Sequence, residues 1–220
     1  FLTHGVPIKD SRKCFWNAYY NTDIICTSEE AADLRCKAFE GGRDIARILG
    51  FPRNDLLLRS NDCKAKLDLD KYKKVIVWMP TFKHSNAVKP SQNFIVEQYK
   101  DISILSDEIA KNLNDILREC NSILIIKFHP AQNMDYVDLF NHSNIKTYTN
   151  TDLYSYNVGV YELLSISSAL ITDFSSVYID YLLCDKPIAF ELGDMDNYGR
   201  GFLMNNPLDY MPGAKLYGER

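Results

Sequence analysis

The sequence contains short polar segments whose side chains suit phosphate chemistry. Asp173, Ser175 and Ser176 place a carboxylate and two adjacent hydroxyls directly after an apolar run. Lys83 and His129 also come shortly after apolar runs and add a positive charge and an imidazole. Hydroxyl and ammonium groups donate hydrogen bonds to phosphate oxygens, and histidine also exchanges protons near neutral pH. These residue types indicate a site for an anion at which a proton is transferred.

The elements expected around these residues alternate between strand and helix. Continuous apolar runs, such as KVIVWM and ILIIKF, are typical of strands buried on both faces of a sheet. The expected strands are 74–79, 123–128, 145–148, 169–172 and 187–190. The expected helices are 101–120, with Ile102, Leu105, Ile109, Leu113 and Ile116 at helical spacing, 160–167 and 177–183. Because helical crossovers make successive strands parallel, the sequence predicts an α/β fold with a mostly parallel, doubly wound sheet.

Parallel strands would bring the candidate site residues to one edge of this sheet. Open α/β sheets bind ligands just beyond the carboxyl ends of their strands, which places Thr81, Lys83, His129 and the segment 173–176 together. The serines also begin the expected helix 177–183, where unpaired N–H groups favour phosphate. Each feature has a structural interpretation as well: Asp173 and the serines as helix caps, His-Pro as a turn, and the lysine as solvated surface. The phosphate hypothesis depends on all of them meeting at one edge.

Composition narrows the class of protein. The chain has 25 basic and 29 acidic residues, a formal net charge of −4, so it lacks the overall basic field that attracts nucleic acid or anionic membranes. The six cysteines are scattered, with no CxxC pair and no histidine at ligand spacing, so neither a zinc site nor a disulfide scaffold is indicated. No apolar run approaches the length needed to cross a bilayer. Any anion site must therefore be local.

The length and the two ends of the chain bear on domain organisation. With 220 residues, the chain suits one domain, or a modest domain with an appendage. It begins FLTH, without an initiating methionine, and ends GER, without a concluding helix. We therefore expect a fragment of a longer protein.

Six segments, in order along the chain, resemble motifs of one known family. The family is that of the CDP-glycerol glycerophosphotransferases, the polymerases that build teichoic acids and related phosphate-linked capsular polymers. The segments and the motifs that they resemble are residues 4–9 (HGxPxK), 50–55 (G-[FY]-P-R-N-D), 79–83 (A-P-T-[FW]-R), 126–130 (K-x-H-P), 170–176 (L-I-T-D-Y-S-S) and 198–213 (Y…R-G-F…P-G). Each motif alone is weak, but six in order are specific, and they cover almost the whole chain.

The sequence departs from the family pattern at three places. Lys83 stands where the family usually has arginine, which keeps the charge but loses the planar fork that grips phosphate with two donors. Ser168 stands where aspartate is common, and the spacing from Tyr198 to Arg200 is shorter than usual. These changes bear on the identity of the donor and leave the transfer chemistry in place.

The resemblance implies a GT-B-type architecture, in which two Rossmann-like domains enclose the active site. Residues 1–20 would be a junction segment that carries HGxPxK, and residues 21–220 the C-terminal, nucleotide-binding domain. The N-terminal partner domain, which in the family helps to bind acceptor and membrane, would be missing from this chain. The full-length protein is then expected in the cytoplasm, peripheral to the inner face of the cell membrane, with membrane contact only through the absent segments.

The activity implied by the resemblance is polyol-phosphate transfer. Glycerol phosphate or ribitol phosphate would pass from a CDP-polyol to a hydroxyl of a growing cell-wall or capsular polymer, or of a lipid-linked acceptor, and CMP would leave. The resemblance makes His4 the candidate base, since an imidazole suits proton removal from an alcohol. His129 is the second catalytic candidate, aimed at the negative charge that develops on the leaving group. The sequence does not choose between glycerol and ribitol.

The remaining candidates would bind the donor. The hydroxyls and the lysine would hold the pyrophosphate, while the carboxylate would orient the loop or bind a hydroxyl, because two anions repel. Arginines of the second and sixth motifs are phosphate candidates that could equally be structural ion-pair partners. The donor-binding candidates are Thr81, Lys83, Asp173, Ser175, Ser176, Arg53 and Arg200.

No metal or other cofactor is expected. Asp194-Met195-Asp196 is formally a DxD, a pattern that can hold Mg²⁺ against a nucleotide diphosphate. Short acidic doublets are frequent, however, and in the family this region does not form a metal-dependent core.

Two other functions share these features. A GT-B glycosyltransferase that uses a nucleotide sugar would have the same fold and phosphate site but no need for the HGxPxK base. A noncatalytic nucleotide-binding module is the other alternative, and the abrupt chain ends keep it open.

Overall fold

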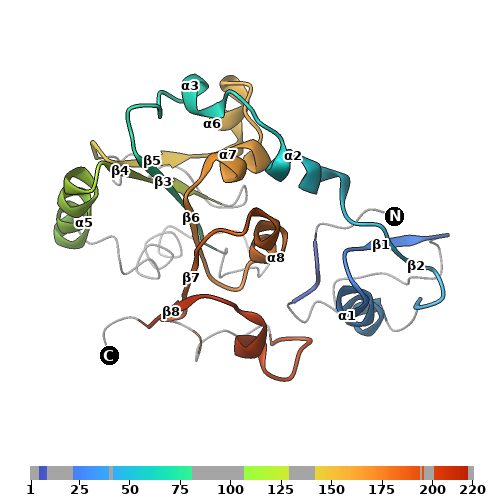
Figure 1. Ribbon diagram of the computed structural model, residues 1–220. Helices are drawn as coiled ribbons and strands as arrows, with labels where there is room; N and C mark the ends of the chain where they lie inside the picture. The colour runs from blue at the N-terminus through green and yellow to red at the C-terminus, as the bar shows by residue number, and fades with distance from the viewer. Residues whose placement is uncertain are drawn as a thin grey trace, which may run out of the picture.

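The main body of the protein is a six-stranded parallel sheet (Figure 1). The computed structural model describes residues 5–8, 22–39, 42–80, 107–128, 142–193, 195 and 201–217. Across the sheet the strands run in the order β5-β4-β3-β6-β7-β8, and every neighbouring pair is parallel. Their bounds are β3 Lys74–Met79, β4 Ser122–Lys127, β5 Ile145–Tyr148, β6 Ala169–Thr172, β7 Ile188–Glu191 and β8 Ala214–Leu216. The doubly wound α/β fold predicted from the sequence is confirmed.

The order of the strands creates a reversal point in the middle of the sheet. From β3 the chain builds outward through β4 to β5, then returns to the other side of β3 and builds outward again through β6, β7 and β8. The reversal lies between β3 and β6. In open α/β sheets, ligands bind beyond the carboxyl ends of the strands at such a point.

Both faces of the sheet are covered, which explains why the central strands are apolar throughout. All six residues of β4 are buried. On one face, Leu124 and Ile126 pack with Leu117 of helix α5, Asp107–Glu119. On the other face, the alternate residues of the same strand pack with helices α6, Asn150–Ser155, α7, Val160–Ile166, and α8, Val177–Tyr181. Shorter helices α2, Asp55–Leu58, and α3, Cys63–Lys66, pack against α7.

A small second unit lies beside the main sheet. Strands β1, Ile24–Cys26, and β2, Ala46–Ile48, pair in parallel, and helix α1, Glu29–Phe39, packs on them. Figure 1 shows this unit on the opposite side of the molecule from α5. Residues 5–8 join the two parts: Arg35 of α1 donates a hydrogen bond to the Gly5 carbonyl, while Ile8 is buried in the main core and accepts a bond from Leu203 N at 3.0 Å.

Several predicted elements shift slightly in the structure. The expected strands 123–128 and 187–190 lie one residue earlier and later, respectively, and the expected helix 177–183 divides into α8 and a 3₁₀ turn, Leu182–Cys184. The side chains that α5 buries are also shifted. Ile109 and Ile116 are exposed, whereas Ala110 and Leu117 are buried, because the helix turns a neighbouring stripe toward β4.

Other features were not predicted or lie outside the described residues. The elements not predicted from the sequence are strands β1, β2 and β8, which have only three residues each, and helices α1, α2, α3 and α6. The loop expected at 83–100 and the domain boundary between residues 20 and 21 lie outside the described residues. No helix within the described ranges is long and apolar enough to cross a membrane.

Candidate functional site

The carboxyl ends of β3, β4 and β6 are level with one another. Met79 of β3 pairs with Thr172 of β6, whose hydroxyl donates to the Met79 carbonyl at 2.9 Å. On the other side, Trp78 pairs with Ile126, so the next residue of β4, Lys127, is level with Met79. The three strands therefore end side by side, at the reversal point.

The structure describes only part of the candidate site. Asp173, Ser175, Ser176 and Arg53 are described. The candidates that lie outside the described residues are His4, Thr81, Lys83, His129 and Arg200, together with Asp194 and Asp196 of the DxD. Their roles stay predictions.

The loop after β6 combines a buried carboxylate with two more accessible hydroxyls. Asp173 is buried, whereas Ser175 and Ser176 are partly exposed. Phe174 anchors the loop, because its ring packs edge-on against Phe202 with a centroid distance of 5.1 Å and lies in the core. The carboxylate is therefore less accessible than the two hydroxyls, and the roles expected for all three groups stay predictions.

Ser176 does not use its hydroxyl as a helix cap. It occupies the position before α8, but its backbone is already helical and its side chain makes no capping hydrogen bond. The capping interpretation therefore does not describe Ser176. Because α8 has only five residues, the electrostatic field at its N-terminus is weaker than expected from the sequence. The Ser176 hydroxyl is therefore a stronger candidate than the helix N-terminus for binding an anion.

Gly5, which follows His4 in the chain, lies directly against this loop. Its φ is +145°, a conformation that other residues rarely adopt, and a Cβ placed on it would be 2.8 Å from the Ser176 Oγ. The same Cβ would be 3.4 Å from Nη2 of Arg53. Only glycine lets the backbone of the HGxPxK segment pass this close to the serine doublet and the arginine. Two segments that are 171 residues apart, 176 − 5, thus meet at one place.

Arg53 forms a partly buried ion pair with Asp180 of α8. Its Nε and Nη2 donate to Asp180 Oδ2 at 3.2 and 3.0 Å, and its guanidinium stacks on the ring of Phe51 at 4.3 Å. Tyr161 donates to the same oxygen at 2.6 Å, and Asn54 donates to Oδ1 at 3.3 Å. Burial, followed by the charge of Asp180, raises the pKa of Tyr161. The ion-pair interpretation of Arg53 thus has a described partner, while its contact with phosphate stays a prediction.

Arg35 is a site residue that the sequence analysis missed. Its side chain, from α1, is 4% exposed and donates a hydrogen bond to the Gly5 carbonyl. Its pKa is lowered to about 10, chiefly by burial and in addition by the nearby positive charge of Arg53. Two guanidinium groups therefore lie close to Gly5. No motif or spacing in the sequence singles out Arg35.

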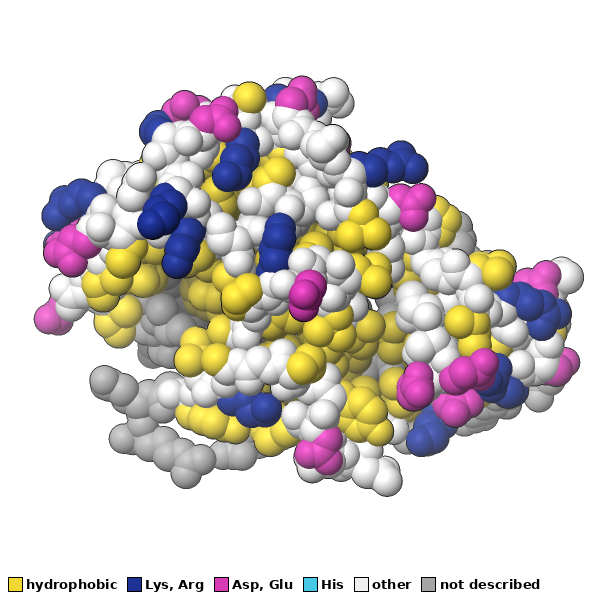
Figure 2. All heavy atoms as spheres, in the orientation of Figure 1, with side chains coloured by type: hydrophobic (Ala, Val, Ile, Leu, Met, Phe, Trp, Pro, Cys, Tyr) yellow, Lys and Arg dark blue, Asp and Glu magenta, His cyan; other side chains and the backbone are white. Residues whose placement is uncertain are grey.

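Two further features of the molecule are the charge of its surface and the arrangement of side chains that could hold a metal. On the face shown in Figure 2, basic side chains are scattered over the upper left, the centre and the right, with acidic side chains among and beside them, so this face does not carry basic side chains alone. Within the described ranges no group of three or more His, Cys, Asp or Glu side chains is arranged to hold a metal ion. The DxD lies outside those ranges, so a metal-free site stays a prediction.

A six-stranded parallel sheet with a reversal point in its middle places the chain in the class of doubly wound, Rossmann-like α/β domains. The sequence then identifies the family within that class. The chain belongs to the CDP-Glycerol:Poly(glycerophosphate) glycerophosphotransferase family, whose profile matches residues 2–219. The family resemblance seen in the motifs is confirmed.

Curated relatives include both glycerol-phosphate and ribitol-phosphate enzymes. The chain is 34% identical to a teichoic acid poly(glycerol phosphate) polymerase of Staphylococcus epidermidis over 89% of this chain and 26% of the relative. It is 30% identical to a teichoic acid glycerol-phosphate primase of Bacillus subtilis over 98% of this chain and 52% of the relative. A teichoic acid poly(ribitol-phosphate) polymerase of Bacillus spizizenii is 28% identical over 87% of this chain and 30% of the relative.

Solved structures show the same fold. A histidine variant of the wall teichoic acid polymerase TagF aligns over 98% of this chain and 55% of that chain, with 26% identity and a TM-score of 0.71. Another histidine variant of TagF, soaked with CDPG, aligns over the same shares with 25% identity and a TM-score of 0.67. This likeness confirms the GT-B-type fold class. The chain spans about half the length of these structures, and between a quarter and about half of the curated relatives above.

Proposed function

We propose that this protein transfers a polyol phosphate from a CDP-polyol to a hydroxyl of a growing cell-wall or capsular polymer and releases CMP. Membership of the family and the names of its relatives support this class of reaction. The observation that carries the proposal is the contact between Gly5 and Ser176. It joins the segment expected to hold the base to the loop expected to hold the phosphate, at the reversal point of the sheet.

In the proposed reaction the acceptor oxygen attacks the phosphorus nearest the polyol. A new P–O bond forms, the P–O bond to CMP breaks, and the acceptor proton passes to a base. We assign that base to His4, because it directly precedes Gly5 in the chain. The electron pair of the broken bond stays on CMP, so stabilisation must be aimed at the diphosphate.

The donors proposed for the diphosphate come from three neighbouring strand ends. Ser175 and Ser176 follow β6, Thr81 and Lys83 follow β3, and His129 follows β4. The level ends of these strands support their convergence. Asp173 would orient the loop from its buried position.

The two arginine candidates differ in their support. Arg53 would act mainly by holding the loop 52–54 and the Gly5 segment in place through Asp180. Arg200 remains a candidate phosphate ligand that the described residues do not test.

We further propose that the acceptor is a polymer or a lipid-linked primer, and that the full-length protein is cytoplasmic and peripheral to the inner face of the membrane. Residues 1–20 would be a junction and 21–220 the nucleotide-binding domain, and the partner domain would supply the membrane contact. The longer relatives support a further domain.

Nucleotide release tests the proposed activity. The full-length protein is incubated with an acceptor and, separately, with CDP-glycerol, CDP-ribitol and UDP-sugars, and the released nucleotide is identified. We expect CMP from one CDP-polyol, and His4→Ala should lower turnover by orders of magnitude with donor affinity nearly unchanged. UDP release would instead show a glycosyltransferase, and binding of nucleotide without release would show a noncatalytic module.

A further inference from the structure

Lys127, the last residue of β4, is a buried cation that the mechanism above does not use. Its side chain is 3% exposed, and its Nζ donates one hydrogen bond, at 2.8 Å, to the carbonyl of the adjacent Phe128. Among the described residues no carboxylate pairs with it. Burial lowers its pKa to about 8, and within the described part of the chain no negative charge offsets this effect. An ammonium has three N–H donors, so one backbone carbonyl leaves most of its capacity unused.

The position of Lys127 follows from the alternation of side chains along β4. Ile123 and Ile125 belong to the core on the face that helices α7 and α8 cover. Side chains two residues apart share a face, so Lys127 points to that face as well. Tyr148, its pairing partner on β5, lies in the same core. The ammonium is therefore on the same side of the sheet as the helix that Ser176 precedes.

Lys127 also lies at the carboxyl ends of the strands, where the candidate site is located. It is level with Met79 and, through β3, with Thr172, which directly precedes the loop of Asp173 and the serines. Neighbouring strands are about 4.8 Å apart, so β4 and β6 are separated by roughly 10 Å. A ligand seated over the end of β3 would span this distance with its two phosphates.

The residues that the structure describes give no structural reason for a charge at this position. Burying an ammonium without a counter-charge is unfavourable, and one hydrogen bond to a neighbouring carbonyl offsets only part of the lost hydration. An apolar side chain of the same length would fill the space without that penalty. A cost of this kind is explained if a ligand supplies the missing negative charge.

We propose that Lys127 is a donor-binding residue whose buried ammonium supplies the counter-charge to the diphosphate of the CDP-polyol. The inference rests on the proposed function and adds a residue to the site. In the absence of donor, the Phe128 carbonyl holds the ammonium in place. Donor binding replaces an unfavourable buried charge with an ion pair in a region of low dielectric, where such a pair is strong.

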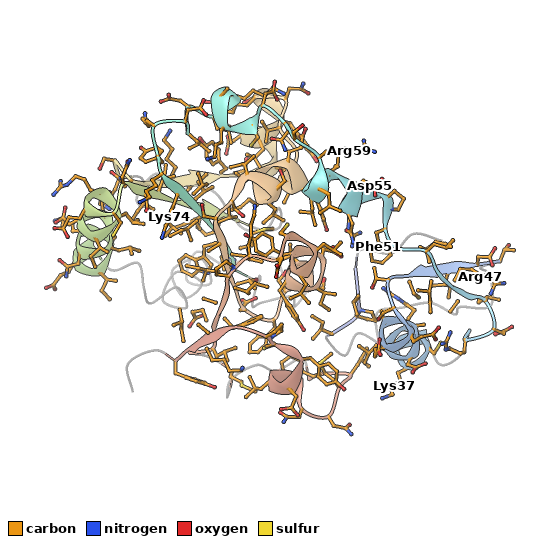
Figure 3. All side chains as sticks on the ribbon, viewed as in Figure 1. Lys37, Arg47, Phe51, Asp55, Arg59 and Lys74 are labelled. Atoms are coloured by element: carbon orange, nitrogen blue, oxygen red, sulfur yellow. The ribbon has the colours of Figure 1, made fainter. Side chains whose placement is uncertain are left out.

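The test measures stability and affinity in one variant of the full-length protein. Lys127→Met keeps the length of the side chain and removes the charge. We expect its melting temperature to rise by a few degrees, while its affinity for CDP and CDP-glycerol falls at least tenfold and its affinity for CMP falls less. Calorimetry with CDP-glycerol, CDP and CMP measures the affinities. The control is Lys74→Met, at the exposed opposite end of the neighbouring strand (Figure 3), which should leave all three affinities unchanged.

Each outcome decides the inference. Unchanged affinity for CDP in Lys127→Met would overturn it and leave the proposed function standing, provided that the wild-type protein releases CMP. A lower melting temperature, or failure to fold, would show that the ammonium serves the fold and would also overturn it. If the wild-type protein binds no cytidine nucleotide, both the inference and the proposed function fail.

Discussion

Asp180 and Lys127 are both 3% exposed, yet their surroundings are opposite. Asp180 accepts hydrogen bonds from Arg53, Tyr161 and Asn54, so its charge is paired and its oxygens are satisfied. Lys127 has one backbone carbonyl and no carboxylate among the described residues. A buried charge with several partners stabilises an arrangement of the protein, whereas a buried charge with few partners is more useful to a ligand. Asp180 therefore holds parts of the site together, whereas Lys127 is proposed to pair with the bound donor.

The largest effect that would test this comparison comes from breaking the Asp180 network. Asp180→Ala leaves Arg53 without its carboxylate and two further donors without their acceptor, so the free energy of unfolding should fall by about 3 kcal/mol. Urea unfolding measures it. The control is Asp55→Ala, which removes the exposed pair with Arg59 (Figure 3) and should change stability by less than about 1 kcal/mol. Equal losses of stability in the two variants would show that the buried Asp180 network stabilises the protein no more than an exposed ion pair does.

Gly5→Ala should have the next largest effect. The added Cβ meets Ser176 Oγ and must adopt a φ of +145°, so the segment has to move away from the loop. We expect a loss of about 1–3 kcal/mol in stability and a tenfold or greater loss of kcat in the full-length enzyme. Gly50→Ala is the control, since it also has a positive φ, of +76°, but no atom lies within 4 Å of the added Cβ. It should lose stability without a comparable loss of kcat.

The pH dependence of stability tests the second residue of the comparison, Lys127. Because the pKa of Lys127 is lowered to about 8 in the folded protein from an ordinary 10.5, its unfavourable charge is fully present below pH 8 and disappears as the pH rises toward 10.5. Tyr148 stays neutral in this range, since burial raises its pKa to about 12. The stability gained in Lys127→Met over wild type should therefore be largest at pH 7 and small at pH 10. Urea unfolding at both pH values measures it, and a gain that does not depend on pH would contradict the assignment.

The smallest expected effect is that of Tyr161→Phe. This substitution removes one of the hydrogen bonds to Asp180 and keeps the ring against which Arg53 lies. The free energy of unfolding should fall by about 1–2 kcal/mol, clearly less than for Asp180→Ala, because the ion pair remains. Combined with Arg53→Lys, it should give a non-additive loss, which a double-mutant cycle detects. Strict additivity would show that the two donors act independently.

The central strands were predictable because burial on both faces leaves a local signal. The runs at 74–79 and 169–172 match β3 and β6, since no polar residue interrupts a strand that has helices on each side. The outer strand β8 has three exposed residues, so it carries no such signal. Helix α5 was found by its periodicity, but the stripe that it buries depends on how it packs against β4.

The candidate site was predictable only in part. The loop 173–176 was placed at the binding edge because parallel connectivity brings strand ends together. The partner of Arg53 is 127 residues away, at Asp180, and the bond from Arg35 to Gly5 spans 30 residues. Charged residues of either sign are common along the chain, so no local pattern selects these pairs.

The sequence by itself determined the class of fold, the family, and which segments are the strands that carry the polar loops, because hydrophobic periodicity and short motifs are local properties of the chain. The tertiary structure alone decided which charges are compensated. Among the described residues, Asp180 meets three donor residues and Lys127 meets a single carbonyl. No local segment determines this difference, because packing of distant strands and helices buries both charges and decides which partners reach them.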